Sequence, residues 1–429
     1  MKKAAETWSG DWWKLGGGGT VWDGVAYDPD TNLVFVGTGN GGPWPEELRK
    51  SKGKDNLFVC SILAVNADTG DLKWYYQNTP GDSWDFDSVQ GFILADVTVN
   101  GRPRKVIMQA NKNGFYYVLD RVTGSFISAQ PFATVTWAKG IDPETGRPII
   151  NPEAHYDNGG GTVTVQPGAG GGHNWSPMSY NPGTGLVYIP TTTTSSGTYT
   201  VDPNFTYTPG RSNTGLLRGN RGGGGAAAAP DNRGAAPQQS ATPAKTLPAI
   251  GPTPPEGQRG MLVAWDPVTQ KERWRAPGGG GIGGGTVTTA GNLVFQVIND
   301  GRLMAYSADK GEKLFEVQTG LRGGMGPPIT FMLDGKQYVA LAGGTGQIPP
   351  PPGGGPGGGA GTAAGGAGAR GAEPLPPDLA GAAAQGAPRG EAPAAAPAPG
   401  PNAPPAGPPV RPKLLVFVLD GKGSLPVGN

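Results

Sequence analysis

The chain has 429 residues, of which 77 are glycine and 45 are proline, a combined share typical of low-complexity sequence. The formal net charge of +1 at pH 7 gives no reason to expect nucleic acid or an anionic membrane as a partner. One cysteine, Cys60, excludes an internal disulfide and a Cys-x-x-Cys-His haem attachment. No run of about 18 apolar residues predicts a transmembrane segment. The N-terminus starts with Lys2 and Lys3 but lacks a following apolar stretch, so no signal peptide is expected.

Two tracts hold most of the glycine and proline. Residues 217–258 are Gly, Ala, Pro and Asn with scattered Arg, and residues 347–412 are almost wholly Gly, Ala and Pro. Neither tract can bury enough apolar surface to offset the entropy of ordering, so both are expected to be disordered. Strand-like sequence flanks each tract, which predicts loop insertions within one domain spanning residues 1–429.

The rest of the chain predicts short β-strands separated by turn signals such as Asn100-Gly101, Asp300-Gly301 and Asp334-Gly335. No amphipathic helix of convincing length lies between them, so the fold class is expected to be all-β. The predicted strands are Leu33–Val36, Ser61–Val65, Leu72–Gln77, Lys105–Gln109, Gly114–Leu119, Leu186–Ile189, Met261–Trp265, Leu293–Ile298, Leu303–Tyr306, Lys336–Leu341 and Leu414–Leu419.

A repeat underlies these strands. In three strong copies a strand ends in a polar turn, and an aromatic residue follows the turn at a fixed distance: Trp74, Trp274 and Phe315. Weaker copies of the turn occur at residues 27–31, 119–124 and 180–185. Such an aromatic can dock on the neighbouring copy and lock propeller blades together, so six copies predict roughly five or six blades. A β-sandwich is the alternative, but it explains the fixed spacing poorly.

Residues 79–87 place three carboxylates, Asp82, Asp85 and Asp87, around one tryptophan. Asp85 and Asp87 have the spacing to bind a hard cation together, or to let one bind while the other takes a proton. The alternative interpretation is a solvated turn, because Asp, Gly and Ser are ordinary turn residues.

Seven motifs resemble, in order, those of the quinoprotein alcohol dehydrogenases, eight-bladed β-propellers that bind pyrroloquinoline quinone (PQQ). The likeness is closest to the quinohaemoprotein ethanol dehydrogenase branch, with methanol dehydrogenase more distant, and it covers nearly everything outside the two tracts. The docking repeat resembles the family's tryptophan-docking motif. The matching motifs lie at residues 6–11, 37–40, 55–57, 84–87, 111–115, 137–140 and 173–178.

The resemblance implies a metal site. Asn40 resembles the family's side-chain amide ligand, although a left-handed turn would also explain an asparagine there. Asp85 resembles the carboxylate beside the metal that acts as catalytic base. At Asp87, calcium-dependent members tend to have a small neutral residue and lanthanide-dependent members have Asp. Because a trivalent ion needs more negative charge, the sequence favours a lanthanide over Ca²⁺, with Asn40, Asp85 and Asp87 as ligands.

Five residues resemble contacts of the cofactor. Trp22 resembles the indole on which the flat quinone stacks, with a core or docking tryptophan as the alternative. Thr20 resembles a polar partner of the cofactor's edge. Lys112 takes the place of the cation beside the quinone carbonyls, where positive charge favours the reduced form; an exposed loop lysine is the alternative. Asn174 and Trp175 resemble further cofactor contacts.

The activity implied by the resemblance is the oxidation of a small primary alcohol to an aldehyde. The metal would act as a Lewis acid on PQQ, and Asp85 would remove the hydroxyl proton as hydride leaves the adjacent carbon. Electrons would then pass to a cytochrome c. The family is periplasmic, so the same location is implied despite the lack of a signal peptide.

Departures from the family pattern qualify this expectation. The match begins at Trp8, well inside the family's propeller, so we expect an incomplete ring of blades. We also expect this chain to be inactive alone. A separately encoded N-terminal portion would then supply the remaining blades, including the family's metal-binding glutamate and adjacent-cysteine disulfide. Ile282 stands where relatives often place a tryptophan, and the C-terminus stops without an attached cytochrome domain.

Two other interpretations stay open. One is a non-catalytic propeller that serves as a binding scaffold, and the other is a decayed gene fragment. A scaffold needs none of the residues Asn40, Asp85, Lys112 and Trp22, so their joint presence favours the enzyme.

Overall fold

The computed structural model describes residues 2–51, 53–157, 159, 161–193, 195–217, 244–258, 260–278, 284–321, 326–344, 412–421 and 425. Ile282 and nearly all of the second low-complexity tract lie outside these residues. Within them, helix is confined to α1 (Lys2–Glu6), α2 (Glu46–Arg49), and the short 3₁₀ helices η1 (Trp12–Leu15) and η2 (Pro152–Ala154). None of these helices has the length and apolarity needed to cross a membrane.

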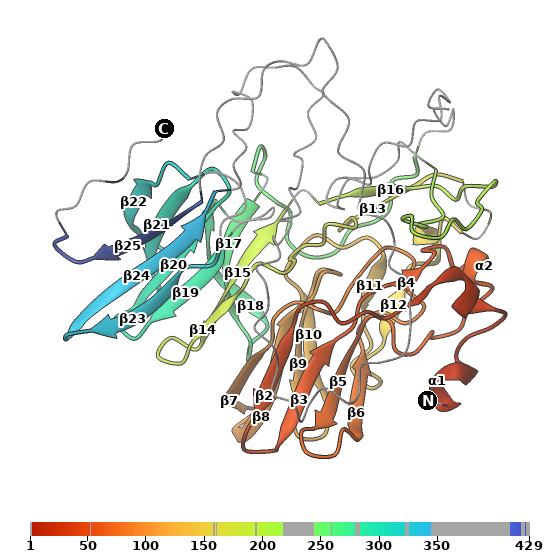
Figure 1. Ribbon diagram of the computed structural model, residues 1–429, viewed down its shortest axis with the longest axis horizontal. Coiled ribbons are helices and arrows are strands. Elements are labelled where there is room, and N and C mark those ends of the chain that lie inside the picture. The colour runs from red at the N-terminus through yellow and green to blue at the C-terminus, as the bar shows by residue number, and fades with distance from the viewer. Residues whose placement is uncertain are drawn as a thin grey trace, which may run out of the picture.

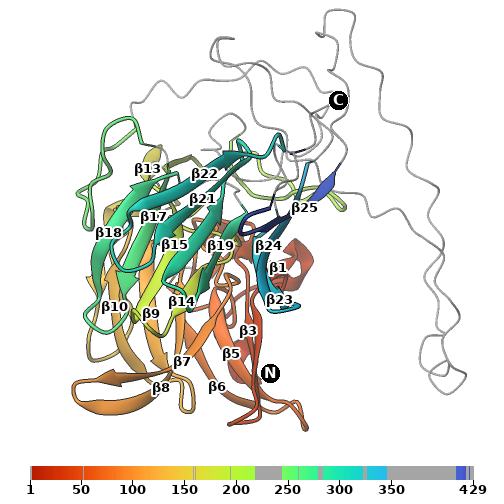
Figure 2. The same cartoon turned by 90° about the vertical axis from the view of Figure 1, so that its left-hand side faces the viewer.

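Antiparallel sheets make up most of the described chain, as predicted, and five of them follow one another as consecutive blades (Figures 1 and 2). Blade 1 contains β2 (Val25–Asp28), β3 (Leu33–Gly37), β5 (Ser61–Asn66) and β6 (Leu72–Gln77). Blade 2 contains β7 (Ile93–Val99), β8 (Arg102–Ala110), β9 (Phe115–Asp120) and β10 (Phe126–Pro131). Blade 3 contains β14 (Ser179–Asn181), β15 (Leu186–Thr192), β17 (Gly260–Asp266) and β18 (Lys271–Pro277). Blade 4 contains β19 (Gly285–Thr289), β20 (Leu293–Val297), β21 (Arg302–Ser307) and β22 (Lys313–Gln318). Blade 5 contains β23 (Ile329–Leu333), β24 (Lys336–Gly343) and β25 (Lys413–Val418).

Three two-stranded sheets accompany the blades. They pair β1 (Gly17–Gly18) with β4 (Gly41–Gly42), β11 (Ala138–Ile141) with β12 (Pro148–Ile150), and β13 (Val163–Val165) with β16 (Gly197–Tyr199).

Each blade packs its apolar face against the next blade in the chain. Phe35 of blade 1 shares a buried cluster with Leu119 of blade 2. Similar clusters join blade 2 to blade 3, blade 3 to blade 4, and blade 4 to blade 5. Because consecutive blades pack face to face, the arrangement is that of a propeller, and five described blades fall within the predicted five or six.

The docking repeat works as predicted in two of its strong copies. The Trp74 indole of blade 1 donates from Nε1 to the Arg121 carbonyl of blade 2 at 3.3 Å. Its ring covers Gly124, where an added β-carbon would lie 2.6 Å from the indole. Trp274 of blade 3 covers Gly311 of blade 4 in the same way. A tryptophan on the outer strand of one blade therefore closes over the turn of the next.

The fixed spacing of the repeat has a structural cause. In each strong copy the aromatic faces an alanine across the hairpin, and the register shifts directly after that pair: Ala64 with Trp74, Ala264 with Trp274, and Ala305 with Phe315. The third copy departs from the prediction, because Phe315 is 45% exposed whereas the two tryptophans are buried.

The first low-complexity tract is ordered at its C-terminal end, contrary to expectation. Ile250 exchanges two backbone hydrogen bonds with Val135, at 2.9 and 2.8 Å, and Leu247 is buried in a core cluster. The tract separates β15 from β17, which are neighbours in blade 3, with Tyr188 opposite Ala264. The second tract separates β24 from β25, which pair directly in blade 5.

Candidate active site

The loop between β6 and β7 presents the predicted catalytic base. Trp84 and Phe86 are fully buried in a cluster beneath the loop, which fixes the two residues flanking Asp85. The Asp82 carboxylate accepts the backbone N–H groups of Trp84 and Asp85 at 3.1 Å and of Phe86 at 3.2 Å. Asp85 has a φ of +69°, a left-handed conformation that is uncommon outside glycine and is found at functional sites. Asp82 thus holds the turn that raises Asp85 out of the core.

Lys112 lies between two of the predicted metal ligands. Its ammonium, on a side chain that is 4% exposed, is 3.1 Å from Asp85 and 2.6 Å from Asp87. Burial raises the pKa of the Asp85 carboxyl well above its usual range; Lys112 opposes this effect, and the negative charges of Asp87 and Asp82 add to it. Burial alone would lower the pKa of Lys112, but the two carboxylates outweigh burial and raise it.

Asn40 and Asp85 meet at one cleft. The cleft has a volume of about 500 Å³, and its lining includes Thr20, Asn40 and Asp85. The Asn40 backbone N–H donates to Asp87 Oδ1 at 2.8 Å, which draws the Asn40 segment towards the carboxylates. Asp87 Oδ2 accepts a hydrogen bond from the Lys112 ammonium, so both carboxylate oxygens of Asp87 already accept hydrogen bonds from the protein.

Trp22 lies close to Gly39 and to the Asp87 carboxylate. An added β-carbon at Gly39 would lie 2.8 Å from Asp87 Oδ1, 3.2 Å from the Thr20 carbonyl and 3.4 Å from Trp22 Nε1. Only a glycine therefore lets these three segments converge. The Trp22 side chain is 48% exposed, unlike the buried docking tryptophans, which leaves its ring available for stacking.

Asn174 and Trp175 are placed less directly. The Asn174 amide donates to the Gly170 carbonyl at 3.0 Å and accepts from the Trp175 N–H at 2.9 Å, so it stabilises its own loop. That loop packs on Lys112, whose carbonyl accepts from Gly172 at 3.0 Å. Of the predicted site residues, only Thr20, Asn40 and Asp85 are among the described residues that line the cleft; Trp22, Asp87, Lys112, Asn174 and Trp175 are not.

Arg49 is a residue of the site that the sequence did not reveal. The buried guanidinium donates to the carbonyls of Pro43 at 2.6 Å, Trp44 at 2.5 Å and Asp82 at 2.8 Å. These contacts tie the segment after Asn40 to the loop that carries Asp85. No local pattern marks such an arginine, because its contact with the Asp82 carbonyl joins segments 33 residues apart.

The donors at the cleft suit a hard cation and a flat anionic cofactor. The Asn40 side-chain carbonyl and the Asp85 carboxylate are oxygen ligands of the kind that Ca²⁺ and similar ions prefer. Lys112 adds a buried positive charge, and Trp22 adds an exposed ring. The residues present therefore fit PQQ with its metal ion.

The comparisons agree with this arrangement. The fold defines a β-propeller, and its cleft presents the oxygen atoms of Asn40 and Asp85. A family model described as "PQQ: Glucose/ethanol/alcohol dehydrogenase, beta-propeller domain" matches residues 1–135 and 161–339. The chain belongs to this family.

Two curated relatives show the extent of the match. The chain is 47% identical over 351 residues to quinohemoprotein alcohol dehydrogenase ADH IIB of Pseudomonas putida, and 45% identical to quinohemoprotein alcohol dehydrogenase of Comamonas testosteroni. Each alignment covers 81% of this chain and 46% of the relative. The chain therefore spans about half the length of the curated relatives it matches.

Solved structures give the same result. The structure of quinohemoprotein alcohol dehydrogenase ADHIIG from Pseudomonas putida HK5 matches with a TM-score of 0.68 and 43% identity, over 80% of this chain and 47% of that one. A europium-containing methanol dehydrogenase matches with a TM-score of 0.65 and 36% identity, over 79% of this chain and 53% of that one.

Proposed function

We propose that this chain carries the catalytic base and part of the metal and cofactor site of a PQQ-dependent alcohol dehydrogenase. The substrate would be a small primary alcohol, and the product an aldehyde. The observation that carries the proposal is the meeting of Asn40 and Asp85 at one cleft, with the Lys112 ammonium 3.1 Å from the Asp85 carboxylate. The named activities of the relatives support the same reaction class.

Asp85 is the base in this proposal. Its carboxylate lines the cleft, and burial raises its pKa, which strengthens it as a proton acceptor. Bound PQQ with its metal ion supplies the hydride acceptor. Asp85 takes the hydroxyl proton of the alcohol, while Asn40 and Asp85 offer oxygen atoms to the ion.

Lys112 provides the counter-charge of the site. Two carboxylates within hydrogen-bond reach of one buried ammonium leave the group with one net negative charge, which a bound cation can offset. A cation that binds Asp85 has to share this carboxylate with Lys112. The lysine thereby keeps positive charge next to the cofactor, which favours the reduced, electron-rich form.

Asp87 favours a lanthanide over Ca²⁺ in this proposal. A second carboxylate beside Asp85 gives the site more negative charge, which a trivalent ion uses better than a divalent one. The likeness to a europium-containing methanol dehydrogenase supports this choice. In the structure Asp87 binds Lys112 and the Asn40 N–H, so it would act as a ligand only after Lys112 moves.

The proposal includes partners. A cytochrome c would accept the electrons, and the location would be periplasmic. This chain does not span the whole length of its relatives. The remaining part would lie on the same polypeptide or on another one, such as a separately encoded N-terminal portion.

The test is turnover by a completed propeller. The chain is joined to the part of ADH IIB that it does not span, loaded with PQQ and either La³⁺ or Ca²⁺, and assayed by alcohol-dependent reduction of cytochrome c. Asp85→Asn should lower the rate about 10²–10⁴-fold. The exposed carboxylate of Asp71 gives the control, since Asp71→Asn should leave the rate unchanged. Equal rates for both variants would reject Asp85 as the base.

A further inference from the structure

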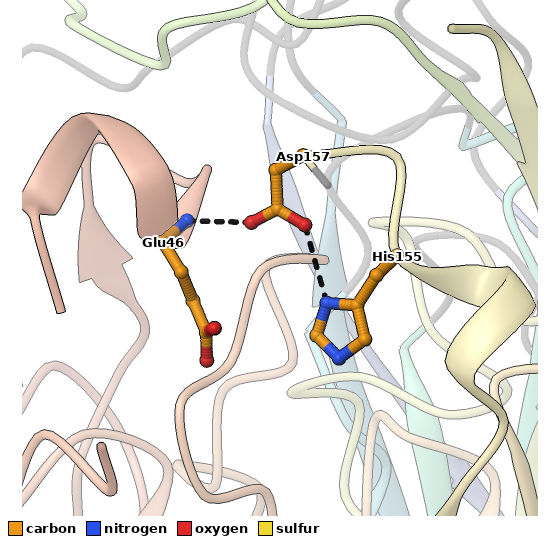
Figure 3. A group of neighbouring side chains, drawn as sticks. All are labelled: Glu46, His155 and Asp157. Carbon is orange, nitrogen blue, oxygen red and sulfur yellow. Dashed lines mark hydrogen bonds and ion pairs between the residues drawn. The ribbon is translucent and has the colours of Figure 1, made fainter. Parts of the chain in front are cut away.

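Three side chains outside the cleft converge behind the loop that carries Asp85 (Figure 3). Glu46 begins α2, and His155 and Asp157 follow η2. One ligand atom from each residue lies within 4.8 Å of the others, and His155 Nδ1 is 3.2 Å from Asp157 Oδ1. The Glu46 carboxylate and the His155 ring lie on the same side of Asp157.

The two carboxylates of this cluster are buried, and among the described residues only His155 forms an ion pair with either of them. Glu46 is 8% exposed and Asp157 is 2% exposed, yet no described lysine or arginine forms a salt bridge with either. The one hydrogen bond described for the Glu46 carboxylate comes from the Gly53 N–H at a long 3.3 Å. Asp157 accepts hydrogen bonds from the Glu46 N–H and Ser83 Oγ and contacts His155, so the Glu46 carboxylate is the member of the cluster whose buried charge lacks close partners.

We propose that Glu46, His155 and Asp157 bind a divalent transition-metal ion such as Zn²⁺. One imidazole nitrogen and two carboxylate oxygens are ligands that Zn²⁺ commonly takes. The 3.2 Å between His155 Nδ1 and Asp157 Oδ1 matches the roughly 3.3 Å between adjacent ligands of a tetrahedral zinc site. Glu46 has to close the cluster by up to about 1.5 Å, from 4.8 Å to the tetrahedral spacing, which its single long hydrogen bond permits.

The ligand chemistry separates this cluster from the cleft. Asn40, Asp85 and Asp87 offer only oxygen atoms, which suit Ca²⁺ and lanthanides. An imidazole nitrogen suits borderline metals instead. The inference does not depend on the proposed function, because it concerns a different ion at a different place.

A bound ion would hold the catalytic loop from behind. Ser83 Oγ donates to Asp157 Oδ2 at 3.1 Å, and the Trp84 indole donates to the Ala154 carbonyl at 3.1 Å. The Trp84 and His155 rings lie 4.9 Å apart. The ion would therefore join the start of α2 and residues 154–157 to the loop that presents Asp85.

The experiment is a calorimetric titration of the chelator-treated chain with ZnCl₂, and separately with LaCl₃. We expect one zinc ion per chain, and a loss of zinc affinity of about 100-fold or more in His155→Gln and in Glu46→Gln. The matched control is Asp85→Asn, which should keep zinc binding. Far-UV circular dichroism checks that each variant is folded. If His155→Gln does not fold, the Glu46→Gln variant still tests the inference.

Two results would overturn the inference: no stoichiometric zinc binding by the wild-type chain, or zinc affinity unchanged in both variants. Failure of the proposed function looks different, because it removes lanthanum binding and leaves the zinc titration as it was.

Discussion

The Lys112 ammonium lies 3.1 Å from the Asp85 carboxylate and joins two neighbouring blades at the site. Asp85 belongs to the loop that leaves blade 1, and Lys112 to the turn between β8 and β9 of blade 2. Asp87 adds a second carboxylate at 2.6 Å. The position that the family resemblance gives to a cation beside the cofactor is thus the position of a buried counter-ion.

Replacing this counter-ion should unbalance the site. Lys112→Met leaves two buried carboxylates without their cation, so we expect a loss of about 3–5 kcal/mol in the free energy of unfolding. A metal ion should then restore more stability to the variant than to the wild type, because it replaces the lost charge. Urea unfolding with and without LaCl₃ measures both effects.

Lys105 provides the control for Lys112. It is exposed and forms an ion pair with Asp30, so Lys105→Met should leave the free energy of unfolding nearly unchanged and show no lanthanum dependence. Equal losses for the two variants would contradict a special role for Lys112.

Arg49 should be essential for holding the segment after Asn40 next to the loop that carries Asp85. Arg49→Lys keeps the charge but cannot reach the carbonyls of Pro43, Trp44 and Asp82 together, so we expect a loss of about 2–4 kcal/mol. Lanthanum affinity, measured by titration of the folded variant, should fall as well. Arg147→Lys, at an exposed ion pair, should change neither quantity. Unchanged stability of Arg49→Lys would be incompatible with the role given to this residue.

The docking repeat allows a comparison between two glycines with the same φ angle. Gly70 and Gly124 both have a φ of +74°, but an added β-carbon meets nothing within 4 Å at Gly70 and meets the Trp74 ring at 2.6 Å at Gly124. Gly70→Ala should cost about 1 kcal/mol for the backbone conformation alone. Gly124→Ala should cost a further 1–3 kcal/mol or so, because the indole has to move. Thermal unfolding that finds both variants equal would show that Trp74 does not dock on this turn in solution.

His173 should make the stability of the chain depend on pH. Burial lowers the pKa of this histidine from 6.5 to about 4, and its Nδ1 hydrogen-bonds the Pro190 carbonyl at 2.8 Å. As the pH falls, this histidine is protonated in the unfolded chain before it is protonated in the folded chain. Its contribution to the free energy of unfolding is therefore complete above pH 6.5 and is lost as the pH falls towards 4. We expect a decrease of about 1 kcal/mol per pH unit in this window. His173→Asn should flatten that slope in urea unfolding between pH 4.5 and 8; an unchanged slope would assign the effect to other groups.

The central strands were predictable from sequence because they are buried on both sides. Leu186–Ile189 and Met261–Trp265, for example, are continuous apolar runs in the middle of blade 3. The outer strand β22 is mostly exposed along its length, so its composition says little; a strand was expected there only because the repeat places Phe315 after its turn. Pairing with β21 along one edge makes it a strand.

The residues of the candidate site likewise fall into those that the sequence predicted and those that it did not. Asn40, Asp85 and Lys112 could be proposed because they stand in motifs that resemble a family. Arg49 and His155 could not, because their roles come from contacts between segments far apart in the chain. The order of residues 244–258 was also missed, since it rests on the pairing of Ile250 with Val135 across more than a hundred residues.

The most direct measurement is cofactor binding by the chain joined to the remaining part of ADH IIB. PQQ is titrated in the presence of LaCl₃ or CaCl₂ and followed by absorbance, with Asn40→Ala, Asp85→Ala and Trp22→Ala as variants. We expect stoichiometric, metal-dependent binding that is tighter with La³⁺ and weakened about tenfold or more in each variant. Absence of binding, or binding that ignores both the metal and the three substitutions, would contradict a PQQ site at this cleft.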